Sequence, residues 1–489
     1  MFAKYSAKQM RNPAVVGADN RRSTLDLDPG PRSIEGGAGS PQNFAINRPP
    51  LAISTLGELR SDKTGRLLVI GGMGRSGFDP AIPRTDKGLV GEIKDYVNND
   101  SWFDDVADGP VEAEIVVDGA QQRAEGAWVL VGPPDFAPSV RSYRTMYDTH
   151  VDLIVREMAL PTDDGLFAGP LADIASMNAA WKGHGTIGDF RPSFVRHIYP
   201  ILSAIAQVGR SYDGPDFNFH HPFLDPAGYG DLGGPSSVED TRKFIFAVIR
   251  DPGTLLKKSN PIEPLMMPAI LGDYYGEANG RGGEKDPAYF HSVSQVQYAL
   301  LRAWSEGKFE ADWTGAAPPP STKITPEGLD RAALENAVGG PFFPGIEAGW
   351  LFARKEAFRA PFRVAKGKTV GRAAVPVKPG QPPQKRDIVL EAGAFSQQMA
   401  QPWQADFLMC RSEVPFKDGR KIGWWPVQRP EKVFLSATSD KRLTWARHKD
   451  GSGFDERYLA MVDEWSTLGF LVGEDDALIE VDGPAPLVG

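Results

Sequence analysis

The sequence changes character at AWVLVGPPDFAP, residues 127–138. Its first five residues form a short apolar run that ends at Gly and Pro, which is typical of a strand. Two similar runs precede it, LLVI at residues 67–70 and AEIVV at residues 113–117. Each is bounded by Gly, Asp or Pro, so we expect half-buried strands. Residues 1–138 are therefore predicted to form a β-rich N-terminal region with an antiparallel sheet.

Helical spacing takes over after this point. Apolar residues recur at intervals of three and four in three segments: residues 153–160, 194–205 and 296–304. A fourth segment, residues 329–338, ends at Gly339-Gly340, a pair that suits a helix C-terminus. The basic, Pro-rich stretch at residues 375–387 is expected to be a solvated loop. We predict an α+β fold in which residues 139–489 are mainly helical, with irregular Gly/Pro-rich connections.

Composition limits the possible functions. A chain of 489 residues is long enough for about two domains with ample buried volume. Its net charge of −9 argues against nucleic acid or an anionic membrane as the main partner, since either needs a basic face. The N-terminus lacks the apolar segment of a secretory signal, and no apolar run is long enough to span a membrane. We therefore expect a cytoplasmic protein, with unconventional export left open.

Familiar catalytic motifs give weak signals. GGMGRSG, residues 71–77, is glycine-rich after a strand, but it lacks a P-loop lysine and a following helical pattern, so it favours a plain turn. His220 and His221 are adjacent, and on a strand they would point to opposite faces, where they rarely bind one metal together. No G-x-S-x-G serine accompanies the seven histidines. The sequence predicts neither a phosphate loop, nor a metal site, nor a hydrolase triad.

QPWQADFLMCRSE, residues 401–413, carries an unusual set of side chains. It contains the only cysteine, Cys410, and Asp406 lies four positions earlier, on the same side of a helical turn. Five of the eleven tryptophans follow residue 400: Trp403, Trp424, Trp425, Trp445 and Trp465. A lone cysteine is usually a buried structural thiol. However, a thiol, a carboxylate and an indole are also the set needed to build a protein-derived quinone, in which an indole is oxygenated twice and cross-linked to a cysteine sulfur.

Ordered motifs run through nearly the whole chain. They include DPGPRSIEGG (28–37), LGELRSDKTGRLLVIGGMGRS (56–76), RPSFVRHIYPIL (191–202), LENAVGGPFFPGIEAGW (334–350), PWQADFLMC (402–410) and MVDEWSTLGFLV (461–472). In this order they resemble the LodA-like family of cysteine tryptophylquinone (CTQ) enzymes, the relatives of L-lysine ε-oxidase and glycine oxidase. So many ordered matches are hard to reach by chance. The resemblance makes residues 139–489 the expected catalytic region, which carries the quinone site.

The resemblance assigns roles to three residues. It implies that Cys410 is the cross-linking cysteine, Asp406 the essential acid and Trp465 the modified tryptophan, joined to Cys410 by a thioether. The pattern around Trp465 also allows a core tryptophan, because it shares an apolar helical face with Tyr458, Met461, Val462 and Leu468. Three other tryptophans remain rivals for the modified position: Trp424, Trp425 and Trp445.

The implied activity is that of a quinoprotein amino-acid or amine oxidase. A quinone carbonyl is an electrophile that a substrate amine can attack, and Asp406 would remove a proton from the substrate Cα. Dioxygen would reoxidise the reduced cofactor, giving hydrogen peroxide and ammonia. The implied partners are a small amine or amino-acid substrate, O2, a maturation flavoprotein and further copies of the chain in a homo-oligomer. No metal, nucleic-acid or membrane partner is expected.

Two alternatives stay open. The quinone could act on a peptide-bound or carrier-bound residue or as an oxygenase, or the chain could be a non-catalytic relative whose cysteine stays a thiol. The joint presence of Asp406, Cys410 and Trp465 argues against the non-catalytic alternative. Three basic residues are candidates for binding an anionic substrate group, with solvated surface charge as the alternative: Arg411, Lys417 and Lys421. Family members usually carry an additional segment before the DPGPRSI region, so substrate specificity is left open.

Overall fold

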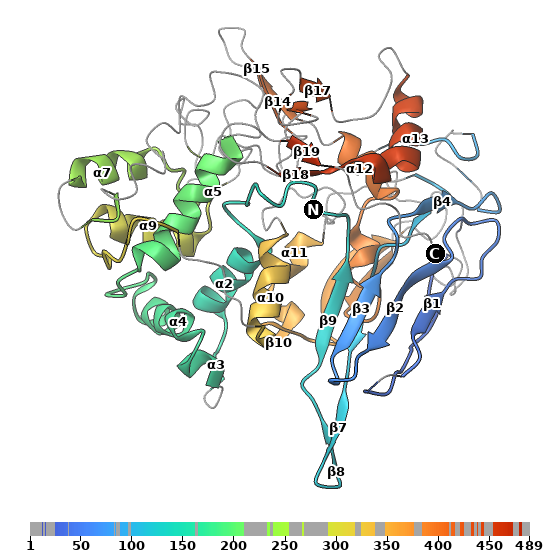
Figure 1. Cartoon of the computed structure of the whole chain (residues 1–489), viewed down its shortest axis with the longest axis horizontal. Helices are drawn as coiled ribbons and strands as arrows, with labels where there is room; N and C mark the ends of the chain where they lie inside the picture. Colours follow the sequence, from blue (N-terminus) through green and yellow to red (C-terminus); the bar gives the residue numbers. More distant parts are fainter. Residues whose placement is uncertain are drawn as a thin grey trace.

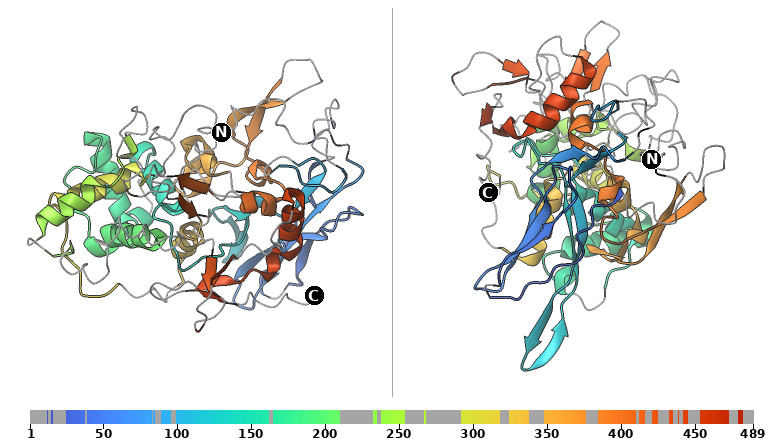
Figure 2. Two further views of the ribbon diagram at one scale, coloured as in Figure 1. Left: turned by 90° about the horizontal axis from the view of Figure 1, so that it is seen from above. Right: turned by 90° about the vertical axis from the view of Figure 1, so that its right-hand side faces the viewer.

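The computed structural model describes the chain at residues 12, 15, 25–37, 39–82, 84, 89–95, 99–161, 165–209, 232–234, 238–253, 267, 292–317, 324–337, 348–375, 384–409, 412–415, 421–424, 432–434, 438, 442–444, 453–472 and 479–481. Figure 1 shows strands at one end of the molecule and most helices at the other. The view from above in Figure 2 shows the same division. The predicted α+β fold is confirmed.

The N-terminal region is built from antiparallel strand pairs. β1 (Gln42–Ala45), β2 (Thr55–Ser61) and β3 (Leu67–Gly71) form a three-stranded sheet. Three pairs follow: β4 (Ser76–Phe78) with β5 (Trp102–Asp104), β6 (Ala107–Val111) with β9 (Ala127–Val131), and β7 (Glu114–Val117) with β8 (Ala120–Arg123). All these pairings are antiparallel. The three predicted strands are present as β3, β7 and β9.

β3 and β7 are more exposed than the sequence led us to expect. Every residue of β7 is exposed, and so are the four apolar residues of β3, Leu67, Leu68, Val69 and Ile70. The expectation of half-buried strands is therefore wrong for these two. β7 and β8 form a hairpin that extends away from the body of the molecule (Figures 1 and 2). An apolar, β-branched run favours a strand, but it does not reveal whether another layer covers that strand.

The predicted helical segments form the other end of the molecule. They correspond to α2 (Met146–Glu157), a π-helical turn η3 (Phe194–Ile198) that continues into α5 (Tyr199–Gly209), and α9 (Gln295–Ser305). Capping boxes start α2 at Thr145 and α9 at Ser294, where a side-chain oxygen accepts an otherwise unsatisfied backbone N–H. Further helices pack around them: α3 (Gly165–Ala168), α4 (Ala172–His184) and α7 (Glu239–Ala247).

The fourth predicted helix is shifted along the chain. α10 spans Pro326–Glu335 and starts earlier than expected, because Thr325 caps its first turn. It ends at Glu335, and Gly339 and Gly340, the predicted cap, lie outside the described residues.

The last third of the chain contains short strands that the sequence analysis did not identify. α11 (Gly349–Phe352) leads into three antiparallel pairs: β10 (Phe358–Ala360) with β11 (Arg363–Val364), β12 (Thr369–Val375) with β13 (Gln384–Val389), and β14 (Ser412–Pro415) with β15 (Lys421–Trp424). The expected loop at residues 375–387 is therefore wrong at both ends, which belong to β12 and β13. Residues 376–383 lie outside the described part.

A four-stranded sheet and two helices complete the C-terminal part. The sheet has the order β17 (Arg442–Thr444), β16 (Lys432–Phe434), β19 (Ile479–Val481) and β18 (Phe470–Val472), with β16 and β19 parallel. The helices are α12 (Trp403–Met409) and α13 (Phe454–Glu464). Both lie beside β4 of the N-terminal region (Figure 1).

One large core joins these parts. Its buried residues come from the helices, including α12 and α13, from the loop after β9 and from several strands, among them β5 with Trp102 and β18 with Leu471. The two ends of the molecule therefore share buried apolar surface, the main source of folding stability. Among the described residues, no helix has the length and apolar character needed to cross a membrane.

Candidate active site

α12, which carries Asp406, is fixed at its start by the N-terminal region. The backbone N–H of Trp403 donates to Oδ2 of Asp104, at the end of β5, over 3.1 Å. The first N–H groups of a helix have no partner within the helix, so this carboxylate satisfies one of them and favours the helix dipole. Gln404, fully buried, donates through Nε2 to the carbonyl of Gly74 and accepts from Oγ of Ser76, over 3.0 and 2.7 Å.

α13 ends at Glu464, and Trp465 is the next residue. Tyr458, Met461 and Leu468 are buried, and Val462 and Trp465 are partly buried against the same core, so the predicted apolar face is confirmed. The backbone N–H of Leu468 donates to the carbonyl of Trp465 over 3.0 Å, which closes a 3-10 turn after the helix. α12 packs directly against α13.

Trp465 belongs to an aromatic cluster of five residues: Phe136, Trp403, Phe407, Trp465 and Phe470. Trp465 lies edge to face with Trp403, with 5.2 Å between ring centroids, and with Phe136, at 6.5 Å. Phe136 also contacts Phe407 and Phe470, at 5.1 and 6.3 Å. Trp403 and Phe407 are one helical turn apart, so both project from the same side of α12. Two members of the cluster, Trp403 and Phe136, therefore pack directly on Trp465, which is partly buried.

Asp406 lies on α12 between these two aromatic residues. It is three residues after Trp403, and its side chain is only 2% exposed. A buried carboxylate on a helix that packs against the Trp465 segment is unusual, because charged groups are costly to bury. The structure thus brings the Asp406 helix and Trp465 together.

Cys410 follows α12 directly in the sequence and lies outside the described residues. Four other residues also lie outside the described part: Trp425, Trp445, Arg411 and Lys417. Trp424 and Lys421 belong to β15, whose side-chain positions are also outside the description. The cross-link and the anion-binding residues therefore remain predictions.

A loop from the N-terminal region lies against Trp465, which the sequence analysis missed. We call residues 72–75, between β3 and β4, the glycine loop. Gly74 has φ +74°, and a Cβ atom built on it would lie 2.2 Å from Cζ2 of Trp465. From the sequence, GGMGRSG is interpreted as a plain turn without a following helix, and the next element is indeed the strand β4. Nothing local in the motif points to a tryptophan far along the chain.

Two carboxyl groups near this site have raised pKa values. Burial raises the pKa of Asp105, which accepts the N–H of Met73 in the glycine loop over 2.6 Å. Burial also raises the pKa of Asp135, the neighbour of Phe136, to about 6, although the N–H of Ala137 donates to it. A carboxyl group whose pKa lies near neutrality suits proton transfer, and Asp135 directly precedes Phe136 of the aromatic cluster. No periodicity or motif in the sequence marked either residue.

Trp403 contributes an unpaired donor. Its side chain is 1% exposed, and its indole Nε1 has no hydrogen-bond partner in the described part of the chain. Buried donors are nearly always paired, so an unpaired one needs an explanation. Trp403 contacts Trp465 edge to face, so this unpaired donor belongs to a residue that packs on the ring that the family resemblance implies to be oxygenated.

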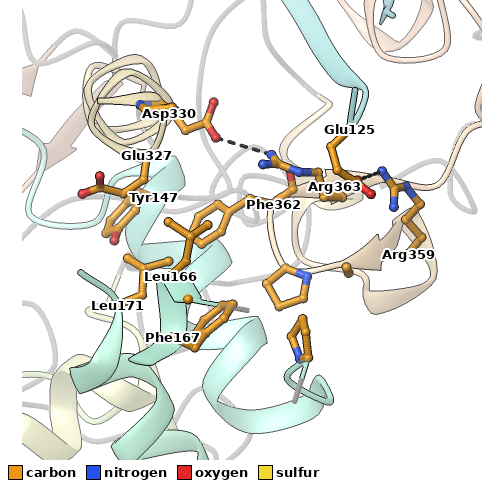
Figure 3. Close-up of a pocket in the computed structure, with 15 residues that line it drawn as sticks. Glu125, Tyr147, Leu166, Phe167, Leu171, Glu327, Asp330, Arg359, Phe362 and Arg363 are labelled. Atoms are coloured by element: carbon orange, nitrogen blue, oxygen red, sulfur yellow. Dashed lines mark hydrogen bonds and ion pairs between the residues drawn. The ribbon is translucent and has the colours of Figure 1, made fainter. Parts of the chain in front are cut away.

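A separate cavity of about 660 Å³ lies at α3, α10 and the β10–β11 turn (Figure 3). Its apolar wall includes Phe167 and Leu171, and Tyr147 stacks on Phe362 with 5.8 Å between centroids. Two ion pairs border it, Arg359 with Glu125 and Arg363 with Asp330. None of its lining residues belongs to α12, α13 or the glycine loop. This cavity is therefore distinct from the Trp465 site.

Two domain models match the chain. The one described as L-Lysine epsilon oxidase N-terminal matches residues 2–131, and the L-lysine epsilon oxidase C-terminal domain matches residues 272–429. Together they span more than half of the chain. The second match includes Asp406 and Cys410, and the first includes the glycine loop.

L-lysine 6-oxidase from Marinomonas mediterranea is 26% identical over 441 residues, which are 83% of this chain and 56% of that protein. The chain thus spans about half the length of this curated relative. A solved structure of L-Lys epsilon-oxidase from the same organism has a TM-score of 0.69 at 21% identity, and one described as its Schiff base intermediate with L-Lys has 0.67 at 22%. Each covers 97% of this chain and 77% of its own. At these identities the likeness establishes the fold.

Proposed function

The chain belongs to the LodA-like family, and from this premise we propose that it is a quinoprotein oxidase of amino acids or related amines. In the proposed reaction a primary amine and O2 yield a carbonyl compound, hydrogen peroxide and ammonia, with water consumed. The observation that carries the proposal is the packing of α12, with its buried Asp406, against the segment of Trp465. A carboxylate and an indole held together in an apolar setting are the groups that this chemistry needs.

The proposed cofactor is cysteine tryptophylquinone, formed from Trp465 and Cys410. Two features of the chain fit an oxygenated, planar ring at position 465. The backbone of Gly74 lies against the ring, where any side chain would collide with it. Trp403 packs against the same ring, and its buried Nε1 N–H, which has no partner among the described residues, is the proposed donor to an oxygen atom of the quinone.

Such a quinone, once formed, supplies an electrophilic carbonyl and accepts two electrons, chemistry that no ordinary side chain offers. Asp406 is the proposed base that takes the proton from the substrate carbon that bears the amine. The same carboxylate is suited to accept the indole proton while the cofactor is built. The contacts with Trp403 and Phe136 hold the Trp465 ring in one orientation.

The substrate class is proposed from the relatives. A curated relative is an L-lysine 6-oxidase, and the domain models carry the same activity in their descriptions. We therefore propose a primary amine of an amino acid as substrate, with L-lysine the first compound to test. The proposed partners are O2 and a maturation flavoprotein that completes the cofactor, in a protein that forms a homo-oligomer in the cytoplasm.

A substrate screen tests this function. Protein co-produced with its maturation flavoprotein is offered each common amino acid and simple amine, and peroxide release is measured. We expect peroxide with one or a few of them, because alignment of one hydrogen of the amine-bearing carbon against the base strongly favours particular substrates. Phenylhydrazine, which adds to quinone carbonyls, should abolish the activity and leave a coloured adduct. An adduct without peroxide from any free amine would contradict the oxidase and favour a peptide-bound or carrier-bound substrate.

A further inference from the structure

Gly74 lies over the face of the Trp465 ring and not at its edge. A Cβ atom on Gly74 would be 2.2 Å from Cζ2, 2.5 Å from Cη2 and 3.0 Å from Cε2. An atom in the plane of the ring, at the same distance outward from Cζ2, would lie farther from Cη2 and from Cε2 than the hypothetical Cβ does. The hypothetical Cβ therefore lies above the plane, and the backbone of Gly74 rests on one face of the six-membered ring.

The glycine loop is fixed in this position by bonds to both regions of the protein. Asp105 accepts the N–H of Met73 over 2.6 Å, and the backbone N–H of Asp105 donates to the carbonyl of Arg75 over 3.0 Å. From the other side, Nε2 of Gln404 donates to the carbonyl of Gly74 over 3.0 Å. Gly72 packs so closely on the carboxyl group of Asp105 that a Cβ there would lie 2.6 Å from its Cγ. These contacts make the loop a rigid cover.

From this geometry we propose that the glycine loop is a lid over one face of the Trp465 ring and that Gly74 is a positioning residue for the reaction. A nucleophile attacks a carbonyl carbon from above or below the plane of its substituents. With the Gly74 side closed, a substrate amine reaches the ring from the opposite face only. This last step rests on the proposed function, whereas the closed face is a property of the unmodified chain.

The close contact with Trp465 explains why position 74 is a glycine. Its positive φ already favours glycine, but several other glycines share that conformation without any close neighbour. Gly65, in the β2–β3 turn, has φ +80° and nothing within 4 Å of a built Cβ. The two positions carry the same backbone strain and differ in the collision with Trp465. Gly65→Ala is therefore a matched control for Gly74→Ala.

The test uses full-length protein produced without the maturation flavoprotein, so that Trp465 stays an ordinary tryptophan. Hydroxyl-radical footprinting with peptide mass spectrometry gives the oxidation rate of Trp465 relative to that of Trp304, which is fully buried in the helical core. We expect Gly74→Ala to raise the relative rate several-fold, because either the loop or the ring must move. Gly65→Ala should leave it unchanged. Equal rates in the two variants, with both folded by circular dichroism, would overturn the lid.

A second pair of variants tests the lid without touching Gly74. Asp105→Ala removes the acceptor for Met73, so the loop should loosen and Trp465 should be oxidised several-fold faster. Asp105→Asn retains an acceptor oxygen of the same shape, so the rate should return towards that of the unaltered protein. If Asp105→Ala leaves the Trp465 rate unchanged, the loop is not a lid held by Asp105.

Experiments on matured protein can distinguish a failure of the lid from a failure of the proposed function. Gly74→Ala should shift the visible absorbance band of the quinone, and Gly65→Ala should not, because only the former contacts the ring. If unaltered protein forms no phenylhydrazine adduct, the quinone fails while the footprinting result stands. If the adduct forms but the footprinting rates of the Gly74 and Gly65 variants are equal, the lid fails and the quinone stands.

Discussion

The indole rings of Trp403 and Trp465 meet edge to face, with 5.2 Å between their centroids and 72° between their planes. Trp403 begins α12, three residues before Asp406, and Trp465 follows α13. This contact therefore fixes the Asp406 helix relative to the indole on which the proposed chemistry depends. Aromatic pairs in this arrangement contribute about 0.5–1.5 kcal/mol beyond their buried area.

Trp403→Phe tests the unpaired donor. The variant keeps an aromatic ring against Trp465 but removes the Nε1 N–H. In matured protein we expect a shifted quinone absorbance and a fall in kcat of about tenfold, the equivalent of one hydrogen bond of about 1.4 kcal/mol. Absorbance spectra and peroxide release measure both. Trp403→Ala, which also empties the ring site, should lower the free energy of unfolding by about 3–5 kcal/mol. Unchanged absorbance and kcat in Trp403→Phe would remove the donor role.

Asp406→Asn tests the proposed base. The substitution keeps the shape of the side chain and removes its ability to take a proton. We expect loss of cofactor formation, or a fall in kcat of at least about 100-fold in any protein that still carries the quinone. Quinone absorbance and steady-state peroxide release separate the two outcomes. Asp463→Asn, at an exposed position of α13, serves as the control and should behave normally. Normal quinone and turnover in Asp406→Asn would reduce Asp406 to a structural role.

A double-mutant cycle on Ser76 and Gln404 tests how the N-terminal region holds α12. Oγ of Ser76 donates to Oε1 of Gln404 over 2.7 Å, and Gln404 is fully buried. Each single change to Ala should lower the free energy of unfolding by about 1–3 kcal/mol, because Ser76→Ala removes a donor to Oε1 of Gln404 and Gln404→Ala removes the donor to the carbonyl of Gly74. The double variant should lose less than the sum, by about 1 kcal/mol. Urea unfolding measures all three variants, and strict additivity would show that the two side chains act independently.

The raised pKa of Asp135 predicts how the stability of the protein depends on pH. Its folded-state pKa is about 6, above the usual 3.8, so the folded protein binds the proton more tightly than the unfolded chain does. The stability that this group contributes is complete below about pH 4 and is lost as the pH rises through 6. Asp135→Asn removes the titration, so its stability relative to the unaltered protein should increase between pH 4 and pH 7.5. The gain is at most about 3 kcal/mol, from about 1.4 kcal/mol per pKa unit.

Urea unfolding of both proteins at pH 4 and pH 7.5 measures this difference. Asp118→Asn, in the exposed β7–β8 turn, should show no such trend. A pH-independent difference for Asp135→Asn would mean that Asp135 does not titrate near 6.

The sequence predicts the α+β fold well because strands and helices leave periodic apolar patterns. β9 and the helical segments of α2, α5 and α9 follow such patterns, and so does the buried face of α13. The solvent exposure of a strand is harder to predict. β7, for example, has the apolar composition of a covered strand but lies in an exposed hairpin. Apart from β12 and β13, the strands after residue 357 have only two to four residues, so they leave little periodicity to detect.

The sequence points only to the local part of the candidate site, and the roles of these residues stay predictions. Asp406 and Cys410 stand out because four residues separate them, and the resemblance to the family implies Trp465. The sequence could not connect the glycine loop to the site, because the contacts join residues that are far apart in the chain. Gly74 and Gln404, for example, are 330 positions apart, and no local pattern records their contact. The raised pKa of Asp135 has the same origin, because burial by distant segments causes it.

Peptide mapping of matured protein tests the central claim most directly. The protein is digested, and the peptides that contain Cys410 and Trp465 are identified by mass spectrometry together with an assay for free thiol. The proposed cofactor predicts one cross-linked species that joins the two peptides and carries two added oxygens, with no free thiol. A free thiol at Cys410 and an unmodified Trp465, in protein isolated from the native host, would contradict it.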